Sequence, residues 1–307
     1  MKKTKNSFVF SKTNFIHSLL LVCIFLVLSS CSSNTENANS SGGGSVTIKP
    51  TNIVHEGSIV LKNQQQLNAF AQKGYTSVNG TLTIGEFPKC DITSLEGLKS
   101  LTKINGCLII IGTIDLNSLQ GLNNITSTEC ISITDAKKLT NIDPLKNLKS
   151  IIDNDLTDGV WMSIISGNDN LIDIDGLSGI ENYVGALQIF NNKALLNLDG
   201  LKNINSFNTF SVAIRQNESL NNLNGLSAVN SIDNVLEISD NENLKSLDGL
   251  NNLNSVKRFC HITGNSKLKN LCAIKGLANN GENFTLDIRS NGYNPTRQDL
   301  INGDCLQ

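Results

Sequence analysis

The chain has 307 residues, of which 39% are hydrophobic and 17% charged, and its formal net charge is −2. Four of the 25 basic residues and none of the 27 acidic ones fall within residues 1–30, so the remainder carries 21 basic against 27 acidic residues, or about −6. Nucleic-acid-binding proteins need clustered basic side chains to neutralise phosphates, and the arginines here are scattered, at Arg215, Arg258, Arg289 and Arg297. We therefore expect no nucleic-acid partner.

Residues 1–30 have the pattern of a secretory signal peptide. Four lysines precede an apolar run from Phe15 to Leu28, which is too short to span a bilayer and is followed by small residues. The run leads into the sequence LSSC at residues 28–31, which resembles the lipobox of bacterial lipoproteins. The resemblance implies that Cys31 is lipidated, becomes the first residue of the mature protein and anchors it in the outer membrane or at the cell surface. A soluble secreted product is the alternative.

The residues after Cys31 are expected to form a flexible tether. The sequence SSNTENANSSGGGSV, residues 32–46, is rich in Ser, Asn and Gly and has no group of apolar residues to bury. We divide the chain into a signal peptide (1–30), the lipidated cysteine with its tether (31–46), an N-terminal cap (47–79) and a repeat domain with a C-terminal cap (80–307).

The N-terminal cap contains the first predicted elements. The sequence SIVLKNQQQLNAFAQK, residues 58–73, predicts a strand followed by a short helix. Asn63 stands where its side chain can accept a hydrogen bond from the first turn of that helix. The apolar face of the helix, which we expect to cover the end of the domain, comprises Leu67, Phe70 and Ala71.

From residue 80 onward the sequence repeats with a period of about 24 residues. Each repeat has an isoleucine, hereafter the reference isoleucine, at the end of a triplet that alternates as a strand does. These residues are Ile110, Ile133, Ile165, Ile189, Ile214, Ile238 and Ile262. Apolar residues follow at positions +6, +9 and +12, as in Leu244, Leu247 and Leu250, a spacing that suits short extended or 3₁₀ pieces at the corners of a coil.

One such unit is not stable by itself. Ordering 24 residues costs roughly 1–2 kcal/mol per residue, whereas about eight buried side chains return only about 1.5–3 kcal/mol each. Stacked units share a core and satisfy one another's backbone hydrogen bonds. The repeat therefore predicts an all-β-like solenoid of about nine coils.

An asparagine stands three residues after the reference isoleucine in most repeats. The set comprises Asn168, Asn192, Asn217, Asn241, Asn265 and Asn291. An inward amide at this place can bond the backbone of a turn and the same amide one coil away. We therefore predict a structural ladder of side-chain amides rather than a set of ligand contacts.

A glycine precedes the +12 residue in five repeats. These glycines are Gly121, Gly176, Gly200, Gly225 and Gly249. A positive φ is the usual reason for a glycine at such a place. However, Pro144 and Ala273 occupy it in two other repeats, and proline requires a φ near −65°. We therefore predict that these glycines allow close packing at a corner and keep ordinary dihedral angles.

The residue before each reference isoleucine points away from the core, which gives one row of side chains along the outside. The row comprises Thr83, Ile109, Ser132, Ile164, Gln188, Ala213, Glu237, His261 and Asp287, with Ser163 in place of Ile164 if that coil slips by one residue. Glu237, His261 and Asp287 are consecutive, and such a trio could bind a metal or do acid–base chemistry. No nucleophile or arginine is expected beside them, so a partner-binding surface that includes Gln188, or a solvated face that discourages strand pairing, is favoured.

One repeat carries an insertion, because the +12 residues Leu145 and Leu177 are 32 positions apart. The surplus contains Asp153, Asp155 and Asp158. Alternating acids before a glycine resemble a calcium loop, but the register is wrong for an EF-hand and no glutamate stands at a ligand distance. We favour a polar excursion, or a protruding partner-contact loop with Trp161 at its base, and expect neither a bound metal nor a cofactor.

Six cysteines follow Cys31, an even number that permits disulfides in an exported protein. Cys272 and Cys305 flank the segment in which the repeat ends, so we pair them. Cys107 and Cys130 each directly precede a strand, on adjacent coils, and neighbouring strands lie about 4.8 Å apart, within the span of a disulfide. The cysteines that this scheme leaves unpaired are Cys90, in an insertion, and Cys260, at an inward core position.

The residues that recur are Leu236-x-Ile238-x-x-Asn241-x-x-Leu244-x-x-Leu247-Asp248-Gly249-Leu250 and their counterparts, preceded by the cap sequence from Gln64. This pattern, over roughly residues 54–305, is similar to that of the receptor L-domain group of leucine-rich-repeat-like solenoids, which includes bacterial surface lipoproteins. The resemblance implies a right-handed parallel β-helix. In receptor ectodomains this fold binds protein ligands.

Motifs for several common chemistries are absent from the sequence, including GxSxG, the Walker loop, HExxH and the dinucleotide fingerprint. We therefore expect a lipid-anchored cell-envelope protein that is not an enzyme, whose solenoid serves as a binding or adhesion module for a protein or glycan. The alternatives are a polysaccharide-cleaving β-helix enzyme and a structural envelope protein without a specific ligand.

Overall fold

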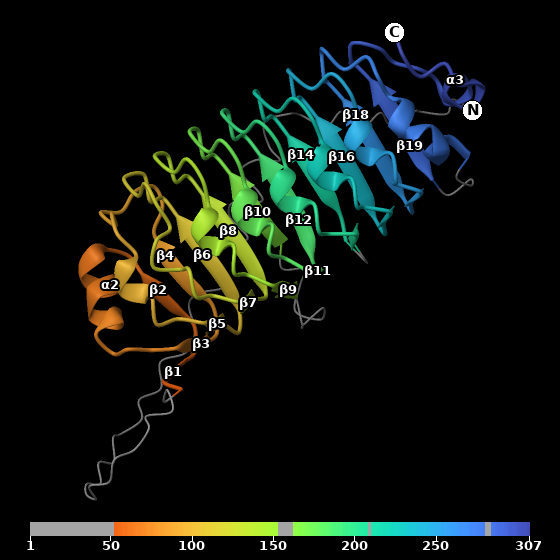
Figure 1. Ribbon diagram of the computed structural model, residues 1–307. Coiled ribbons are helices and arrows are strands. Elements are labelled where there is room, and N and C mark those ends of the chain that lie inside the picture. The colour runs from red at the N-terminus through yellow and green to blue at the C-terminus, as the bar shows by residue number, and fades with distance from the viewer. Residues whose placement is uncertain (1–51, 153–161, 208–209, 280–283) are drawn as a thin grey trace, which may run out of the picture. The chain divides into compact units, whose positions relative to one another are not determined.

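The computed structural model describes residues 52–152, 162–207, 210–279 and 284–307, all within one compact unit, Pro50–Gln307. In these residues the chain is mostly parallel β-sheet with few helices (Figure 1). The predicted signal peptide, the lipidation site, the tether, the acidic loop and Trp161 lie outside the described residues.

The largest sheet has ten parallel strands, which follow one another in the order of the chain. The strands are β2 (Ile59–Leu61), β4 (Leu82–Gly85), β6 (Cys107–Ile111), β8 (Cys130–Thr134), β10 (Met162–Ser166), β12 (Ala186–Phe190), β14 (Val212–Arg215), β16 (Val235–Ser239), β18 (Phe259–Thr263) and β19 (Thr285–Arg289). Reference isoleucines of neighbouring repeats are direct partners in the register, as Ile189, Ile214 and Ile238 illustrate. The sequence period is therefore the step from one strand of this sheet to the next.

Shorter strands precede those of the large sheet and form two further parallel sheets. One has the six strands β1 (Val54–Glu56), β3 (Ser77–Asn79), β5 (Lys103–Ile104), β7 (Ser127–Thr128), β9 (Ser150–Ile152) and β11 (Asn182–Val184), and the other has the three strands β13 (Ser206–Phe207), β15 (Ser231–Ile232) and β17 (Ser255–Val256). Because β1 and β2 pair with β3 and β4, the sheets begin within the segment expected to be the N-terminal cap.

Short 3₁₀ helices follow the large-sheet strands in most repeats, near position +12. They are η1 (Glu96–Leu98), η2 (Asp143–Leu145), η3 (Asp175–Leu177), η4 (Asp199–Leu201), η5 (Asn224–Leu226), η6 (Asp248–Leu250) and η7 (Cys272–Asn279). The three-residue spacing of the apolar positions therefore does correspond to 3₁₀ corners, as the sequence indicates.

Two α-helices lie near the ends of the described chain (Figure 1). The predicted N-terminal helix is α2 (Gln64–Ala71), and the side chain of Asn63 caps it by accepting a hydrogen bond from its first turn. Its buried residues are Leu67 and Phe70, which pack against the end of the core. At the other end, α3 (Arg297–Asn302) closes the chain.

The inward positions of the repeat form one continuous core. All seven reference isoleucines identified from the sequence are fully buried, and so are Leu244, Leu247 and Leu250, which represent positions +6, +9 and +12. Cys260 occupies an inward position as predicted and is 0% exposed. Its burial raises the pKa of the thiol to about 12, because no partner compensates for the lost solvation of a thiolate.

The predicted asparagine ladder is present, and Asn217 illustrates it. Its Nδ2 donates to the carbonyl oxygen of Ile189 in the preceding repeat at 3.0 Å and to Oδ1 of Asn241 in the next repeat at 3.3 Å. Its Oδ1 accepts from the backbone N–H and from Nδ2 of Asn192, both at 3.2 Å. Each amide is therefore fully engaged, which explains how so polar a side chain is buried.

The ladder has two different ends. At the first end, Oδ1 of Asn168 accepts from the backbone N–H of Ala136 at 3.0 Å, and Ala136 itself occupies the ladder position in that earlier repeat. At the last end, the backbone N–H and Nδ2 of Asn291 donate to Oδ1 of Asn294 at 2.9 and 3.2 Å. Asn294 thus accepts the hydrogen bonds that a further repeat would accept.

The corner glycines mostly behave as predicted. Gly176, Gly200, Gly225 and Gly249 have no positive φ, and a Cβ at any of them would overlap a carbonyl oxygen of the preceding repeat. The prediction is wrong at Gly121, whose φ is 109°. A Cβ at Gly121 would also overlap a carbonyl oxygen, so that position requires glycine for two reasons.

The left-handed residue of the repeat lies elsewhere, two positions after the reference isoleucine. Its φ is 54–58° in five repeats, at Asp135, Asn191, Gln216, Asp240 and Ser290, and glycines with positive φ take the same place at Gly112, Gly167 and Gly264. Short polar residues and glycine are the types that tolerate this conformation best. The short polar residues and glycines at this position are a sequence signal for a left-handed turn, and this turn was not predicted.

Candidate functional site

Three rows of side chains cover the outer face of the ten-stranded sheet, which is the face turned away from the core. The middle row holds the residue before each reference isoleucine, and the flanking rows hold the residues three before it and one after it. The register brings Gln188, Ala213, Glu237, His261 and Asp287 side by side on neighbouring strands. The middle row predicted from the sequence is therefore present.

The alternative register for β10 is wrong. Ile164 pairs with Ser132 on one side and Gln188 on the other, which keeps it in the middle row. Ser163 is 1% exposed and faces inward, where its Oγ accepts from the backbone N–H of Ile131 at 3.3 Å. Trp161, predicted to contribute to the binding face from the base of the inserted loop, precedes this strand and lies outside the described residues.

His261 and Asp287 form a contact at the last two strands of the sheet. His261 Nδ1 is 3.3 Å from Asp287 Oδ2, and Arg289 Nη2 is also 3.3 Å from that oxygen. The ring of Phe259 stacks on the imidazole, with centroids 5.7 Å apart and an interplanar angle of 11°. The side chain of Arg289 is 71% exposed, so this corner presents a cation and an imidazole to solvent.

Arg215 lies at the centre of a second cluster, one residue beyond the middle row. Its Nη2 donates to Gln188 Oε1 at 3.0 Å, and its Nη1 lies 3.6 Å from Glu237 Oε2. Its guanidinium carbon is 5.3 Å from the centroid of the Phe190 ring. Ser239 Oγ donates to the other carboxylate oxygen of Glu237 at 3.0 Å. The guanidinium therefore joins the strands on either side of its own.

The expectation that no arginine accompanies Glu237, His261 and Asp287 is wrong. Arg215 and Arg289 each stand directly after a residue of the reference position, Ile214 and Ile288. On a strand, the residues before and after an inward side chain share the outer face. The same alternation that places Glu237 on the outer face also places these arginines there. They were not predicted because only the residue before each reference isoleucine was assigned to that face, and the residue after it was not.

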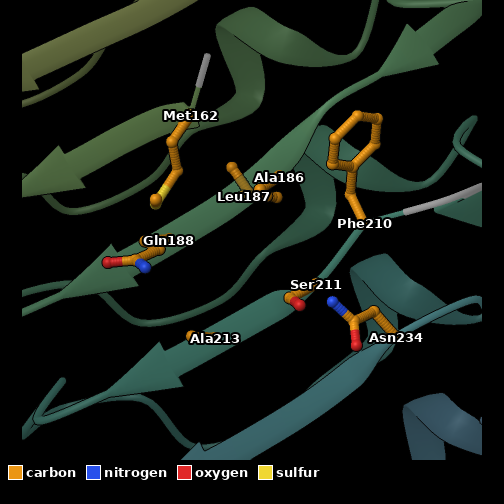
Figure 2. Close-up of a pocket in the computed structure, with 8 residues that line it drawn as sticks. All are labelled: Met162, Ala186, Leu187, Gln188, Phe210, Ser211, Ala213 and Asn234. Carbon is orange, nitrogen blue, oxygen red and sulfur yellow. The ribbon is translucent and has the colours of Figure 1, made fainter. Parts of the chain in front are cut away.

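A pocket of about 240 Å³ opens on this outer face (Figure 2). Its lining comes from four successive strands and the residues just before them, namely Met162, Ala186, Leu187, Gln188, Phe210, Ser211, Ala213 and Asn234. The middle row is shortest at Ala213, between the longer side chains of Gln188 and Glu237. The short side chain leaves the space that the pocket occupies.

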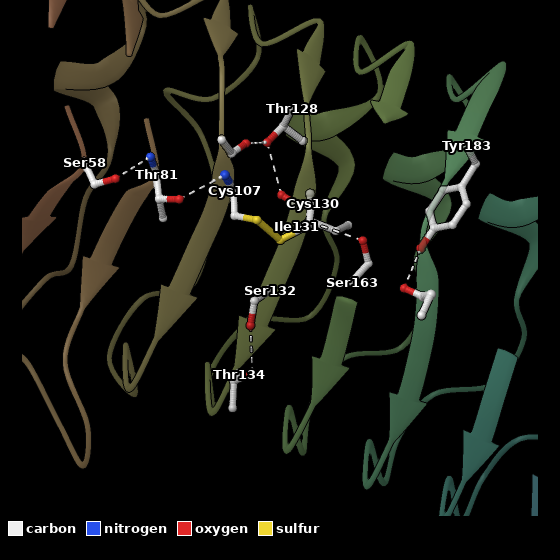
Figure 3. The surroundings of a disulfide bond; sticks show 12 residues. Ser58, Thr81, Cys107, Thr128, Cys130, Ile131, Ser132, Thr134, Ser163 and Tyr183 are labelled. Atoms are coloured by element: carbon white, nitrogen blue, oxygen red, sulfur yellow. Dashed lines mark hydrogen bonds between the residues drawn. A yellow bond between two sulfur atoms is a disulfide. The ribbon is translucent and has the colours of Figure 1, made fainter. Parts of the chain in front are cut away.

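The first strands of the sheet carry a different outer surface (Figure 3). Cys107 and Cys130 are direct partners in the register and form a disulfide with a Cα–Cα distance of 4.5 Å. Beside it, Thr81 Oγ1 accepts from the backbone N–H of Cys107 at 3.3 Å, and Thr128 Oγ1 donates to the carbonyl oxygen of Cys130 at 3.1 Å. No charged side chain stands in the middle row here, which runs through Thr83, Ile109, Ser132 and Ile164.

The second predicted disulfide is present too. Cys272, at the start of η7, is bonded to Cys305, with a Cα–Cα distance of 4.8 Å. It holds the last residues of the chain against the core. Cys90 is buried and free, in agreement with the sequence analysis.

The described residues contain no group of three or more His, Cys, Asp or Glu side chains arranged to hold a metal ion. None of the helices among them is both long enough and apolar enough to cross a membrane. The acids Asp153, Asp155 and Asp158, which resemble a calcium loop in sequence, lie outside the described residues.

The chain was also compared with known proteins. No protein-family model matches it, and no curated protein matches it in sequence. The proposals that follow therefore depend on the residues described above.

Proposed function

We propose that this protein is a lipid-anchored cell-envelope protein whose repeat domain binds a protein or glycan through the outer face of its ten-stranded sheet. In this proposal the parallel sheets belong to a right-handed solenoid of about nine coils, of the receptor L-domain type. The chain-order pairing of the strands and the asparagine ladder support such a solenoid. A binding module of this kind needs no catalytic group, and we propose that the protein is not an enzyme.

The observation that supports a binding face most strongly is the distribution of side chains on it. Charged and aromatic groups gather on β12 to β19, where Arg215, Glu237, His261, Asp287 and Arg289 lie within a few strands of one another. Arginine and aromatic side chains are the types most enriched where proteins bind partners. The uncharged middle row of the first strands, with Thr83, Ile109, Ser132 and Ile164, serves as an internal reference on the same sheet.

The proposed anchor is tested by Cys31→Ala. We expect the wild-type chain to partition into the detergent phase and to resist extraction of membranes by carbonate. The variant should lose both properties or be retained as an unprocessed precursor, without a change in the melting temperature of the repeat domain. Unchanged membrane behaviour of a correctly processed variant would count against lipidation, and the anchor would then have to be another part of the chain.

The proposed binding face is tested with full-length protein on a glycan array and in a pull-down from envelope and host extracts, each with and without calcium. Arg215→Gln and His261→Ala should weaken any binding by at least about tenfold, the effect of losing one interfacial contact. Ser132→Ala, in the middle row of β8, is the matched control and should bind normally. Equal loss in all three variants, or binding that none of them affects, would contradict the proposed face.

A polysaccharide-cleaving enzyme is the second candidate, and the arginines on the outer face favour it. Such an enzyme needs acidic and basic side chains together on one outer face, and Asp287 with His261 and Arg289 meets that need in part. The measurement is release of new reducing ends from acidic and neutral polysaccharides. Release that His261→Ala abolishes would replace the binding proposal. No release from any polysaccharide, together with no partner in the screens above, would favour a structural envelope component.

A further inference from the structure

The pocket at Ala213 has a chemical character that differs from the charged clusters around it. None of its eight lining residues carries a formal charge. Met162, Ala186, Phe210 and Ala213 supply apolar surface, and Gln188, Ser211 and Asn234 supply neutral polar groups. The nearby charges are already engaged with each other, because Arg215 contacts Glu237. A charged ligand would lose its hydration in this pocket without gaining a counter-charge.

The hydrogen-bonding groups of the pocket are oriented by their other contacts. A guanidinium only donates hydrogen bonds, so the Gln188 atom that Arg215 contacts at 3.0 Å is the amide oxygen. The amide nitrogen of Gln188 is therefore the donor that remains. A ligand oxygen next to Gln188 would therefore accept a hydrogen bond from the amide nitrogen. Arg215, which does not line the pocket, fixes this orientation of the amide.

Asn234 supplies a second donor. Its Oδ1 is shielded from solvent and has no hydrogen-bond partner in the structure, so a ligand in the pocket does not reach that oxygen. Figure 2 shows the nitrogen of the same amide turned toward Ser211, which also lines the pocket. The amide nitrogens of Asn234 and Gln188 donate, and the hydroxyl of Ser211 both donates and accepts. The pocket therefore favours a neutral ligand with several hydroxyl groups.

The size of the pocket limits the ligand to one ring. A volume of about 240 Å³ is below the roughly 300–1,000 Å³ of pockets that hold drug-sized molecules. Phe210 lines the pocket and is only 6% exposed, so its ring is held in place by its surroundings. An aromatic face attracts the weakly positive C–H groups of a saturated ring, as it does other positive edges.

We propose that the pocket at Ala213 binds one neutral sugar ring of a glycan. Two oxygens of the ring accept from the amide nitrogens of Asn234 and Gln188, and a C–H face packs on Phe210 and Met162. This inference depends on the proposed function, because it specifies the ligand class and the position for a binding face. An apolar side chain of a protein partner is disfavoured, because it would leave both amides without partners.

The affinity for one ring should be low and measurable. A single ring has about 12 non-hydrogen atoms, and a ligand of that size with ordinary binding efficiency has a Kd on the order of 1 mM. A glycan that engages several copies of the protein at once gains avidity from that weak contact. Saturation-transfer NMR detects binding in this range.

The test uses the full-length chain in a detergent without a sugar headgroup, because a sugar headgroup would compete. The probes are methyl glucoside, methyl galactoside, methyl mannoside and N-acetylglucosamine. We expect saturation transfer to at least one probe with the wild type. Ala213→Leu fills the pocket and should weaken that binding by at least about tenfold, whereas Ser132→Leu places the same side chain in the same row on β8 and should leave it unchanged. Asn234→Leu removes one amide donor together with the buried oxygen that has no partner, so it should also abolish transfer while the chain unfolds at the same temperature or higher.

Each other outcome overturns the inference. Transfer that persists in Ala213→Leu and Asn234→Leu would place the sugar elsewhere. Absence of transfer to every probe would exclude a sugar pocket. If the wild type still binds a partner in the array or pull-down, only the pocket assignment fails. If it binds nothing in any of these experiments, the proposed function fails with it.

Discussion

The two faces of the ten-stranded sheet differ in how much their residues vary between repeats. On the inner face, isoleucine recurs at the reference position of every strand from β4 to β19, from Ile84 to Ile288. On the outer face, the residue just before it is never the same in two consecutive strands, and on β16 to β19 it is Glu237, His261 and Asp287 in turn. One residue along the strand therefore separates a uniform face from a variable one.

The difference follows from what surrounds each face. Inner side chains share one core with the repeats on both sides, so each must match two neighbours of the same shape. Outer side chains meet solvent, and a change there affects the fold little. Residues that repeat therefore carry information about the fold, and residues that break the repeat carry information about function. Substitutions on the two faces should thus differ in kind as well as in size.

The largest effect is expected inside, from the ladder. Asn217→Leu removes the acceptor of the backbone N–H and Nδ2 of Asn192 and the donor to the carbonyl of Ile189. The backbone N–H of Asn192 and the carbonyl of Ile189 each lose a partner at about 1–3 kcal/mol, whereas Nδ2 of Asn192 still donates to the carbonyls of Ile165 and Phe190. The free energy of unfolding should therefore fall by about 2–6 kcal/mol. Denaturant unfolding followed by circular dichroism measures it. Asn221→Leu, at an exposed asparagine of the same repeat, is the control. Equal losses in both variants would show that the ladder contributes little.

The next largest effect is expected from Ile238, and its neighbour Glu237 on β16 provides the comparison. Ile238→Ala should destabilise the protein by about 2–5 kcal/mol, because it leaves a cavity in a fully buried position. Glu237→Ala, one residue away on the outer face, should cost less than about 1 kcal/mol. Both are measured by the same unfolding experiment. If the two variants lost similar amounts of free energy of unfolding, the outer clusters would be needed to hold the sheet together and would not be free for binding.

A small effect on stability is expected at His261. The imidazole is partly exposed and contacts Asp287 at 3.3 Å, so His261→Ala should change the free energy of unfolding by less than about 1 kcal/mol. Differential scanning calorimetry and the partner screen are to be carried out on the same preparation. A large fall in melting temperature would assign His261 to the fold and remove it from the binding face.

The smallest effect has the opposite sign. Burial, and then the neighbouring carboxylates of Asp173 and Asp199, raise the pKa of Asp175. The folded state therefore holds this proton to a higher pH than the unfolded state, and stability falls as pH rises from the usual pKa of an aspartate through the raised value. Asp175→Asn should stabilise the protein at pH 7 by up to about 0.5 kcal/mol and have no such effect at pH 3.

Asn224 occupies the place of Asp175 two repeats later, which supplies a reciprocal variant. Asn224→Asp adds a carboxylate to the same column and should lower the melting temperature at pH 7. Thermal scans at both pH values test the pair. A stabilisation by Asp175→Asn that persists at pH 3 would rule out charge as its cause.

The inner face could be predicted from the sequence because its constraints repeat. Cys260 in the core, the ladder and the pairing of Cys107 with Cys130 all follow from a position within the period and from the spacing of neighbouring strands. The left-handed position was missed because several residue types fill it, so that no single letter recurs. The prediction was wrong at Gly121 because this glycine has a positive φ and also packs closely against a carbonyl oxygen of the preceding repeat. The other corner glycines have only the close packing.

The candidate site could be predicted only in part. The middle row follows from alternation, and Arg215 and Arg289 follow from the same rule applied one residue later. The pocket does not follow from any pattern. It depends on the absence of a long side chain at Ala213 and on the positions of Phe210 and Asn234 before two different strands. Such a space is a property of several side-chain lengths together, which a period in the sequence does not record.

The last amide of the ladder has a consequence for how such a chain can lengthen. Asn294 accepts the final pair of hydrogen bonds, as a capping residue does at the end of a helix. A duplicated repeat placed between Asn241 and Asn265 would bring one new asparagine amide. Its oxygen would accept the hydrogen bonds from Asn241, and its nitrogens would donate those that Asn265 now accepts. The same repeat placed after Asn294 would face an amide already occupied. Growth by duplication is therefore open in the interior of this chain and closed at that end.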